Sequence, residues 1–410
     1  MENNIFELNP EAMKNIANVL RKKIGEGLRE DGREIRCLPT YINPKTGIST
    51  GKTLVLDLGG TNFRATIVEF ADGKAKVHEG IKKNLATVMK AAAGNPPEAL
   101  YAEISELIAS LDLGGVESIG YCFSYPCESM LDGDAVLLHW TKGVTLKGMV
   151  GQPVGQPLMQ YLNEHVEKAK FTTIKVINDT VASLFAGLTD SSSQAHIGLI
   201  VGTGTNMATF FAAGQIPKLH KGYTQQGLVP VNLESGNFYP PHLTVVDDKI
   251  DKYSDSPGAQ RFEKAMSGMY LGRLLEFLFA SDEFEANFDA EKLTRIMSYP
   301  DMYKKKYVRA AWWVYERSSK LVAASLAGLI LALTAAADTP IRDIRLTAEG
   351  SLFWSEDQKG NKNVRFTSYK NAVVDELSSL LRELGHPEIK VHVERTEHAN
   401  LIGSAIAALS

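Results

Sequence analysis

Residues 54–68 form two apolar runs joined by a turn of small and polar residues. Gly59 and Gly60 give this turn backbone freedom and let bare amide N–H groups approach an anion closely. Thr61, Asn62 and Arg64 add side-chain donors around the same point. The pattern predicts a β-hairpin that binds phosphate, although a Gly-Gly pair taken alone favours an ordinary hairpin.

A single carboxylate, Asp57, ends the first of these apolar runs. A carboxylate that faces a phosphate pocket is compatible with the phosphate charge when a divalent cation lies between them. We therefore expect Asp57 to be a partner of Mg²⁺, through a water molecule. The alternative is a surface aspartate at the end of an ordinary strand.

A second glycine-rich turn lies in residues 195–211, where an apolar run, the sequence Gly-Thr-Gly-Thr-Asn at 202–206 and another apolar run follow one another. This organisation repeats that of the first hairpin and indicates a weak internal duplication. It favours two related lobes, each opening with a hairpin and facing one nucleotide across a cleft.

A candidate general base lies where an apolar strand pattern runs directly into a helical one, at Asn178-Asp179-Thr180. An ionised Asp179 at the start of a helix could remove the proton of a substrate hydroxyl. Any of the three residues could instead be the helix N-cap, which is the usual role of such side chains.

Two further polar positions could contact a substrate. Ser124 lies near a strand end, but its place just before Tyr125-Pro126 favours a turn-forming serine on this observation alone. Thr141 and Lys142 place a hydroxyl and an ammonium together beside a glycine, an arrangement suited to a polyol and a transferred phosphoryl group. The alternative for Lys142 is a solvated side chain in a turn.

The composition bounds the class of protein. With 410 residues, 44% hydrophobic and 22% charged, the chain is typical of a globular enzyme with two lobes. A net charge of -4 gives no electrostatic case for nucleic acid or an anionic membrane. Three cysteines without paired spacing support neither a disulfide framework nor a zinc site. We expect a cytoplasmic protein, because the N-terminal residues lack secretory and transit patterns.

Periodic apolar residues predict the elements that position these side chains. Helical spacing predicts helices over residues 10–29 and 97–111, and small residues predict a terminal helix over 402–409. Residues 321–337 carry no charge and are rich in alanine, which predicts a buried helix rather than a membrane span. A further strand enters the turn Gly350-Ser351.

Taken in order, these motifs resemble the hexokinases of the actin-like ATPase and sugar-kinase superfamily. The resemblance spans nearly the whole chain and rests on the ordered set of motifs rather than on any one of them. The matching runs are Leu38-Pro39-Thr40-Tyr41, Asp57 to Arg64, Ser124-Tyr125-Pro126, Trp140-Thr141-Lys142-Gly143, Asn178-Asp179-Thr180, Gly202 to Asn206, Asn232-Leu233-Glu234 and Glu349-Gly350-Ser351.

The resemblance implies an α/β protein with the two-lobed actin-like ATPase (ribonuclease H-like) fold. Each lobe would be a mixed sheet flanked by helices, with the active site in the cleft. The small lobe would comprise residues 51–177 and 398–410, and the large lobe residues 1–50 and 178–397.

The implied function is ATP-dependent transfer of the γ-phosphate of Mg-ATP to the 6-hydroxyl of a hexose, glucose first and mannose second. Asp179 would be the general base, with Lys142 also catalytic. The implied partners are therefore small molecules, a hexose and ATP, with no nucleic acid or membrane, and the protein would be a monomer or homodimer.

The residues around the sugar would be Ser124, Thr141, Lys142, Asn178, Asp179, Asn206 and Glu234. Those around the phosphates, the Mg²⁺ and the adenosine would be Asp57, Gly59, Gly60, Thr61, Asn62, Arg64, Thr203, Gly350 and Ser351.

The chain departs from the family pattern at three places. Ser235-Gly236-Asn237 replaces the usual Trp-Gly-Ala, and residues 397–400 replace a terminal Asp-Gly-Ser-Gly, so the adenosine contacts there are not carried over. Arg273 stands where the family has a Glu, which predicts that the C1 hydroxyl of the sugar loses a charged acceptor. Alternatively, Arg273 turns outward and pairs with Glu276.

Two other functions stay open at this point. A sugar-sensing protein without catalysis is disfavoured by the retention of Asp179 and Lys142, and a repressor by the lack of a leading helix-turn-helix pattern. A kinase that uses another donor or an amino sugar is compatible with the altered surroundings of Ser235 and Asn237.

Overall fold

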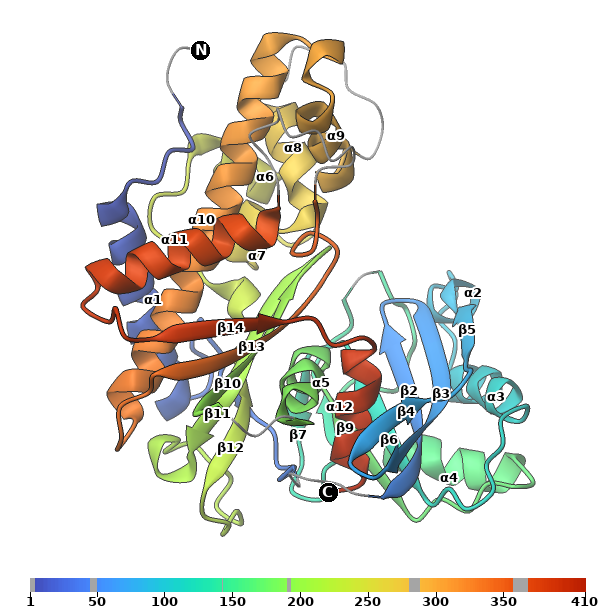
Figure 1. Ribbon diagram of the computed structural model, residues 1–410. Helices are drawn as coiled ribbons and strands as arrows, with labels where there is room; N and C mark the ends of the chain where they lie inside the picture. Colours follow the sequence, from blue (N-terminus) through green and yellow to red (C-terminus); the bar gives the residue numbers. More distant parts are fainter. Residues whose placement is uncertain (1–3, 45–49, 142, 190–192, 280–287, 357–367) are drawn as a thin grey trace. The chain divides into compact units, whose positions relative to one another are not determined.

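The computed structural model describes residues 4–44, 50–141, 143–189, 193–279, 288–356 and 368–410 (Figure 1). The chain divides into two compact units, each made of three segments. Unit 1 comprises Met1–Cys37, Leu199–Met207 and Leu233–Glu394, and unit 2 comprises Leu38–Gly198, Ala208–Asn232 and Arg395–Ser410. The lobe limits expected from the sequence stay a prediction.

Unit 2 is built on a mixed sheet with the strand order β4-β3-β2-β6-β9, and β5 also pairs with β3. Strand β2 is antiparallel to β3 and parallel to β6, which is parallel to β9. The strands are β2 Gly51–Gly59, β3 Asn62–Ala71, β4 Lys74–Val77, β5 Ile81–Asn84, β6 Ser118–Phe123 and β9 Thr173–Ile177, with a separate hairpin of β7 Cys127–Ser129 and β8 Ala135–Leu137. The helices are α2 Ala86–Met89, α3 Pro97–Ile108, α4 Gln156–His165, α5 Asp179–Ala186 and α12 Ala399–Ala408.

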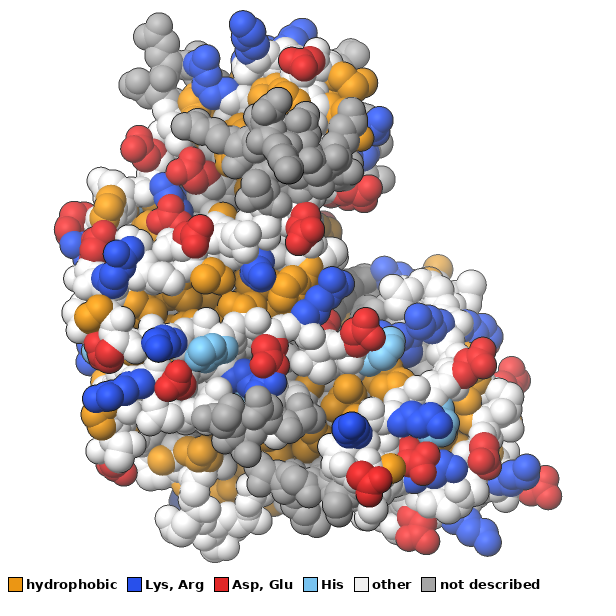
Figure 2. Space-filling model, in the orientation of Figure 1, with side chains coloured by type: hydrophobic (Ala, Val, Ile, Leu, Met, Phe, Trp, Pro, Cys, Tyr) orange, Lys and Arg blue, Asp and Glu red, His pale blue; other side chains and the backbone are white. Residues whose placement is uncertain are grey.

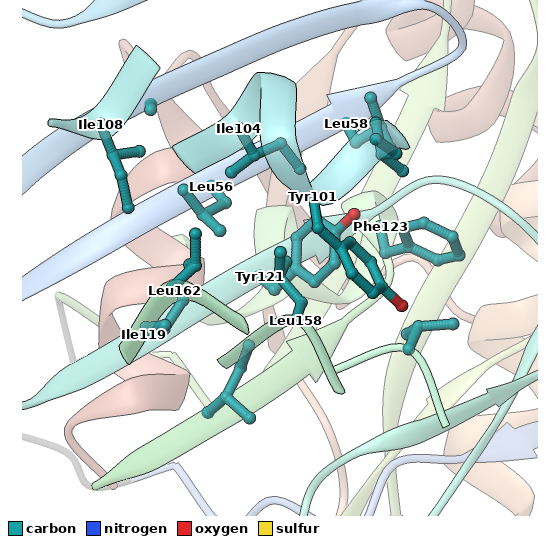
Figure 3. Packing of buried hydrophobic residues seen from close by; sticks show 14 of the residues in the cluster. Leu56, Leu58, Tyr101, Ile104, Ile108, Ile119, Tyr121, Phe123, Leu158 and Leu162 are labelled. Carbon is teal, nitrogen blue, oxygen red and sulfur yellow. The ribbon is translucent and has the colours of Figure 1, made fainter. Parts of the chain in front are cut away.

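Strand alternation sorts the side chains of β2 between two cores. Leu56 and Leu58 pack with residues of α3 and α4, such as Ile104 and Leu158, on one face of the sheet (Figure 3). Val55, on the opposite face, packs in a cluster with residues of α5 and α12. Asp57 has the same parity as Val55 and therefore faces the α5 side.

Small residues let α12 approach its neighbours closely. A Cβ on Gly403 would lie 1.8 Å from the carbonyl oxygen of Ala182 in α5, and a Cβ on Gly120 in β6 would lie 2.2 Å from that of Ser404. Larger side chains at these places would separate the elements. The terminal helix predicted over 402–409 is confirmed, and it begins three residues earlier.

The second sheet has the strand order β1-β12-β11-β10-β13-β14, and the boundary between the two units falls within β10 and β11 along the chain. Its strands are β1 Leu38–Pro39, β10 Ala195–Val201, β11 Thr205–Ala212, β12 Leu228–Asn232, β13 Asp343–Glu349 and β14 Lys390–Glu394. The helices of unit 1 are α1 Pro10–Arg29, α6 Val245–Lys252, α7 Arg261–Met266, α8 Gly268–Leu278, α9 Ala290–Ser298, α10 Lys305–Ala336 and α11 Tyr369–Glu383.

Helix α10 is the buried centre of unit 1 and packs against α1, α8 and α11. A Cβ on Gly328 would lie 2.7 Å from the carbonyl oxygen of Ala17, so α1 and α10 touch backbone to backbone there. Within the described ranges, α10 is the one helix long and apolar enough to cross a membrane by length and composition, and 72% of its most apolar window is buried in the protein. The predicted burial of residues 321–337 is confirmed for most of that stretch.

The surface charge is dispersed. On the face drawn in Figure 2, Lys and Arg side chains are interspersed with Asp and Glu side chains, and neither sign forms a broad continuous area. This distribution matches the small net charge of the chain.

Candidate active site

The first glycine-rich turn is the hairpin that the sequence predicts, with β2 paired to β3 up to Gly59↔Asn62. Gly60 has a φ of 63°, a left-handed conformation that glycine adopts without strain. The Tyr125 hydroxyl donates to the Gly60 carbonyl oxygen at 2.6 Å, and the Asn84 amide donates to Thr61 Oγ1 and Asn62 Oδ1 at 3.1 and 2.9 Å. The turn is thus held by β5 and by the loop after β6.

Asp57 and Arg64 are directly paired on this hairpin. Asp57 is buried, and its Oδ2 accepts from Nε of Arg64 at 2.9 Å and also from Nη2. Burial raises the pKa of the Asp57 carboxyl, while Arg64 opposes the rise and the nearby charge of Asp179 adds to it. Asp57 and Asp179, which are far apart in sequence, therefore lie close enough in unit 2 to interact electrostatically.

Asp57 fits the predicted role of a water-mediated partner of Mg²⁺. One of its carboxylate oxygens already accepts a hydrogen bond from Arg64. The carboxylate is therefore suited to contact the cation through a water molecule rather than directly. Among the residues that the structure describes, no group of three or more His, Cys, Asp and Glu side chains could hold a metal ion. Mg²⁺ is commonly bound by few carboxylates plus the phosphates of the substrate, and Asp57 would be one such carboxylate.

The N-cap of α5 is Asn178, whose Oδ1 accepts from the Thr180 N–H at 2.9 Å. Asp179 is the first residue of the helix, and its Oδ1 accepts from the same N–H at 2.8 Å. Its other carboxylate oxygen makes no hydrogen bond with a described residue. Because Asn178 takes the capping position, Asp179 retains an oxygen that could accept a substrate proton, and the helix N-terminus favours its negative charge.

Ser124 follows β6, and its N–H donates to the Leu58 carbonyl oxygen at 3.2 Å. Its Oγ lies 3.9 Å from the position that a Cβ on Gly59 would occupy, so it borders the glycine-rich turn. The neighbouring Trp140 packs edge-on against Tyr125, with ring centroids 4.8 Å apart, and this contact places Thr141 near the same loop. Lys142 lies outside the described residues.

Unit 2 therefore brings nine of its predicted site residues to one edge of the sheet. The parallel strands β2, β6 and β9 end there, at Gly59, Phe123 and Ile177. The carboxyl edge of parallel strands is where open α/β sheets bind ligands. We call the set at this edge the β2–β3 cluster: Asp57, Gly59, Gly60, Thr61, Asn62, Arg64, Ser124, Asn178 and Asp179.

The second glycine-rich turn lies in unit 1 and forms hydrogen bonds with other segments of that unit. The Thr205 N–H donates to Oε2 of Glu263 in α7 at 3.0 Å, and the Ser235 N–H donates to Oδ1 of Asn206 at 3.1 Å. Glu234, immediately before Ser235, has a left-handed backbone with φ 54° and ψ 47°. We call Thr203, Asn206, Glu234, Glu263, Gly350 and Ser351 the β10–β11 cluster.

Gly350 and the second turn are in close contact. Gly350 has a φ of 109°, and a Cβ there would lie 2.2 Å from the Val201 carbonyl oxygen. The start of α8 reaches the same point, because the Gly268 N–H donates to the Gly202 carbonyl oxygen at 2.7 Å. The structure thus brings Gly202, the residue before Thr203, close to Gly350 and Ser351, and the role of these residues in binding a nucleotide stays a prediction.

Glu263 is the residue that the sequence reasoning missed. It lies in the short helix just before the run that ends in Arg273, and no spacing rule links it to Thr205, which is 58 positions away. Arg273 lies in α8 beside Glu276: burial raises the pKa of Glu276, and Arg273 opposes that rise. Glu263 thus places a carboxylate at the second glycine-rich turn, where it accepts from the Thr205 N–H. The role of Arg273 itself stays a prediction.

Comparison with known proteins places this fold in a class. The structure of a hexokinase from Schistosoma mansoni complexed with glucose superimposes with a TM-score of 0.79 and 25% identity, covering 99% of this chain and 97% of that one. The fold is thus the mixed α/β architecture of the actin-like sugar kinases, as the sequence predicted.

The chain belongs to the hexokinase family, because two models described as hexokinase match residues 2–188 and 196–281, together about two thirds of its length. Hexokinase-3 of Mus musculus is 30% identical over 315 residues, which are 74% of this chain and 33% of that protein. Hexokinase-2 of Oryza sativa subsp. japonica is 28% identical over 312 residues, 73% of this chain and 63% of that protein. The chain therefore spans about a third of the length of the mouse relative.

Proposed function

We propose that this protein transfers the γ-phosphate of MgATP to the 6-hydroxyl of a hexose, glucose first and mannose second. The observation that carries the proposal is the position of Asp179, at the first turn of α5 and in electrostatic contact with Asp57 at the glycine-rich turn. A base and a phosphate-binding turn are thereby joined in one unit. The glucose in the Schistosoma mansoni hexokinase structure supports the choice of sugar.

In the proposed reaction, Asp179 accepts the proton of the 6-hydroxyl while the hydroxyl oxygen attacks the γ-phosphorus. The new O–P bond forms as the bond to the β–γ bridging oxygen breaks, and ADP leaves with that electron pair. Phosphoryl transfer needs positioning and charge stabilisation more than covalent help from the protein. The turn amides, Thr61, Asn62 and Arg64 would hold the phosphates, and Asp57 would contact Mg²⁺ through water.

The remaining residues would bind the two substrates. Thr203, Gly350 and Ser351 would hold the nucleotide, in agreement with the close approach of Gly202, the residue before Thr203, to Gly350 and Ser351. The sugar hydroxyls would be bound by Ser124, Thr141, Lys142, Asn178, Asn206 and Glu234. We add Glu263 to the sugar residues, because its carboxylate lies under the same turn that carries Asn206.

The test is an assay of sugar phosphorylation on the purified full chain. Glucose, mannose and an amino sugar are each supplied with ATP, ADP or polyphosphate, and the sugar phosphate is measured directly. We expect turnover with ATP and glucose and slower turnover with mannose. Glucose binding by calorimetry without any product would instead indicate a sugar-sensing protein, and turnover only with another donor would refute the role of ATP.

A further inference from the structure

Three charged residues form a row across neighbouring strands of unit 2. In the register of the sheet, Asp57 on β2 opposes Arg64 on β3, and Arg64 opposes Lys82 on β5. Directly opposed residues project from the same face of a sheet. Lys82 therefore shares a face with the buried Asp57–Arg64 pair, about 10 Å from Asp57 along the backbone since neighbouring strands are about 5 Å apart.

The adjacent Lys83 confirms which face Lys82 occupies. Lys83 opposes Phe63, a member of the core beneath α3, and its Nζ pairs with Glu103 of α3 at 2.6 Å. Successive residues of a strand point to opposite faces, so Lys82 points away from α3. Its side chain is exposed and forms no ion pair with any residue that the structure describes.

The charges of the β2–β3 cluster indicate a role for the ammonium group of Lys82. Its positive charge in the described part of the chain is Arg64, and Nε and Nη2 of that side chain are both bound to Asp57. Asp179 adds a second carboxylate close to Asp57. A cluster with two carboxylates and one engaged guanidinium carries net negative charge, which opposes the approach of a polyphosphate.

The position of Lys82 relative to the turn is fixed by its own strand. Asn84, two residues further along β5, donates hydrogen bonds to Thr61 and Asn62 within the turn. The Leu85 N–H also donates to the Thr61 carbonyl oxygen at 2.7 Å. Strand β5 and the phosphate turn thus form one hydrogen-bonded piece, with the ammonium on a flexible stem beside it.

We propose that Lys82 is a nucleotide-binding residue whose ammonium contacts the triphosphate of MgATP at the Gly59-Gly60 turn. The inference rests on the proposed function, because it assumes that this turn holds the phosphates of ATP. It assigns a role to a residue that the motifs do not contain. Lys82 supplies the positive charge that Arg64 cannot supply while it is bound to Asp57.

The experiment compares Lys82→Ala with Lys83→Ala in the full chain. We expect Lys82→Ala to raise the KM for MgATP about tenfold, in the range for loss of one charge-assisted contact at an exposed site, and to leave the KM for glucose unchanged. Lys82→Arg should restore the KM for MgATP to within about threefold, because it retains the charge. Lys83→Ala, its matched control on the opposite face, should leave both constants within about twofold of wild type.

Titration of wild type and of both alanine variants with MgATP, together with the activity of wild type, distinguishes failure of the role of Lys82 from failure of the proposed function. The affinity for MgATP should fall in Lys82→Ala and become less dependent on salt, as expected after loss of a charge that contacts phosphate. If the two alanine variants behave alike in an active enzyme, the role of Lys82 is refuted and the proposed function stands. If wild type binds MgATP but phosphorylates no hexose, the proposed function fails, and the titration still decides whether Lys82 contacts the nucleotide.

Discussion

The two glycine-rich turns look alike in sequence but obtain their charged groups in different ways. The β2–β3 hairpin carries its own, since Asp57 and Arg64 are paired on its two strands. Residues 195–212, which form the β10–β11 hairpin, contain no Asp, Glu, Lys or Arg. Their carboxylates come from Glu234 and from Glu263 in α7. The charge pair of the β2–β3 hairpin is suited to binding phosphate and a metal ion. The β10–β11 hairpin has no such charges of its own, and its carboxylates come from segments that are distant in sequence.

The two turns also differ in how tightly they are packed. A Cβ on Gly59 would meet Ser124 Oγ at 3.9 Å, an ordinary contact. A Cβ on Gly204 would lie 2.5 Å from Oε2 of Glu263, and one on Gly202 would lie 3.3 Å from the Cα of Gly350. At Gly59 of the first turn, the described residues therefore leave room for a Cβ. The second is closed on its inner side by protein.

The largest expected effect tests whether the β2–β3 cluster carries the chemistry. Asp179→Ala should lower kcat by about 10²-fold or more, because a positioned general base contributes roughly that factor. The melting temperature should change little, since Asn178 caps α5 in the variant as in the wild type. Steady-state kinetics and thermal denaturation together check this. Retention of half the wild-type turnover would reduce Asp179 to a structural residue of the helix start.

This contrast explains how much the sequence could predict. Asp57, the glycine pair and Arg64 lie within eight residues, so local pattern and strand register were sufficient to place them together. The terminal helix also followed from its small residues, and the buried helix from a stretch without charge that is rich in alanine. Glu263 could not be found in this way, because its contact with Thr205 arises from the packing of α7 under a turn 58 residues earlier. Arg273, close to Glu263 in sequence, departs from a motif, and the role that this departure predicts for it is not tested by the contacts of α8.

A smaller effect is expected when the distant carboxylate of the β10–β11 cluster is neutralised. Glu263→Gln retains an oxygen for the Thr205 N–H but loses the charge, and it should raise the KM for glucose about ten- to a hundredfold, the range for a hydrogen bond to a charged group. The KM for MgATP should stay within about twofold if Glu263 serves the sugar.

Glu276→Gln is the matched control for this change. Glu276 lies in α8 beside Arg273, in the same unit but outside the β10–β11 cluster, and its replacement should leave the KM for glucose unchanged. Equal effects of the two variants would show that the result reflects charge in the region rather than a contact. The contrast between the two turns would then no longer hold for the β10–β11 hairpin, because its turn would not depend on a carboxylate from a distant segment.

The packing difference predicts unequal tolerance of alanine. Gly204→Ala must displace the Glu263 carboxylate and should cost about 1–3 kcal/mol of unfolding free energy, as overpacking typically does. Gly59→Ala meets only an ordinary contact and should stay within about 0.5 kcal/mol of wild type. Thermal or denaturant unfolding of both variants measures the difference. Equal losses would mean that the two turns are packed alike in solution.

The smallest effect concerns the pH dependence of stability at the locally charged turn. Because burial raises the pKa of Asp57 in the folded protein above its unfolded value, the folded state binds the proton more tightly. Stability contributed by this group is therefore greatest at pH values below its unfolded pKa and declines as the pH rises through the folded pKa.

Asp57→Asn, which cannot ionise, should be at least as stable as wild type at pH 7 while losing activity, and the difference in melting temperature should shrink toward pH 4. A variant less stable than wild type at pH 7 would show that the charged contact with Arg64 outweighs the burial of Asp57. The first turn would then be held by its ion pair, rather than carrying that pair at a cost for the sake of the phosphate site.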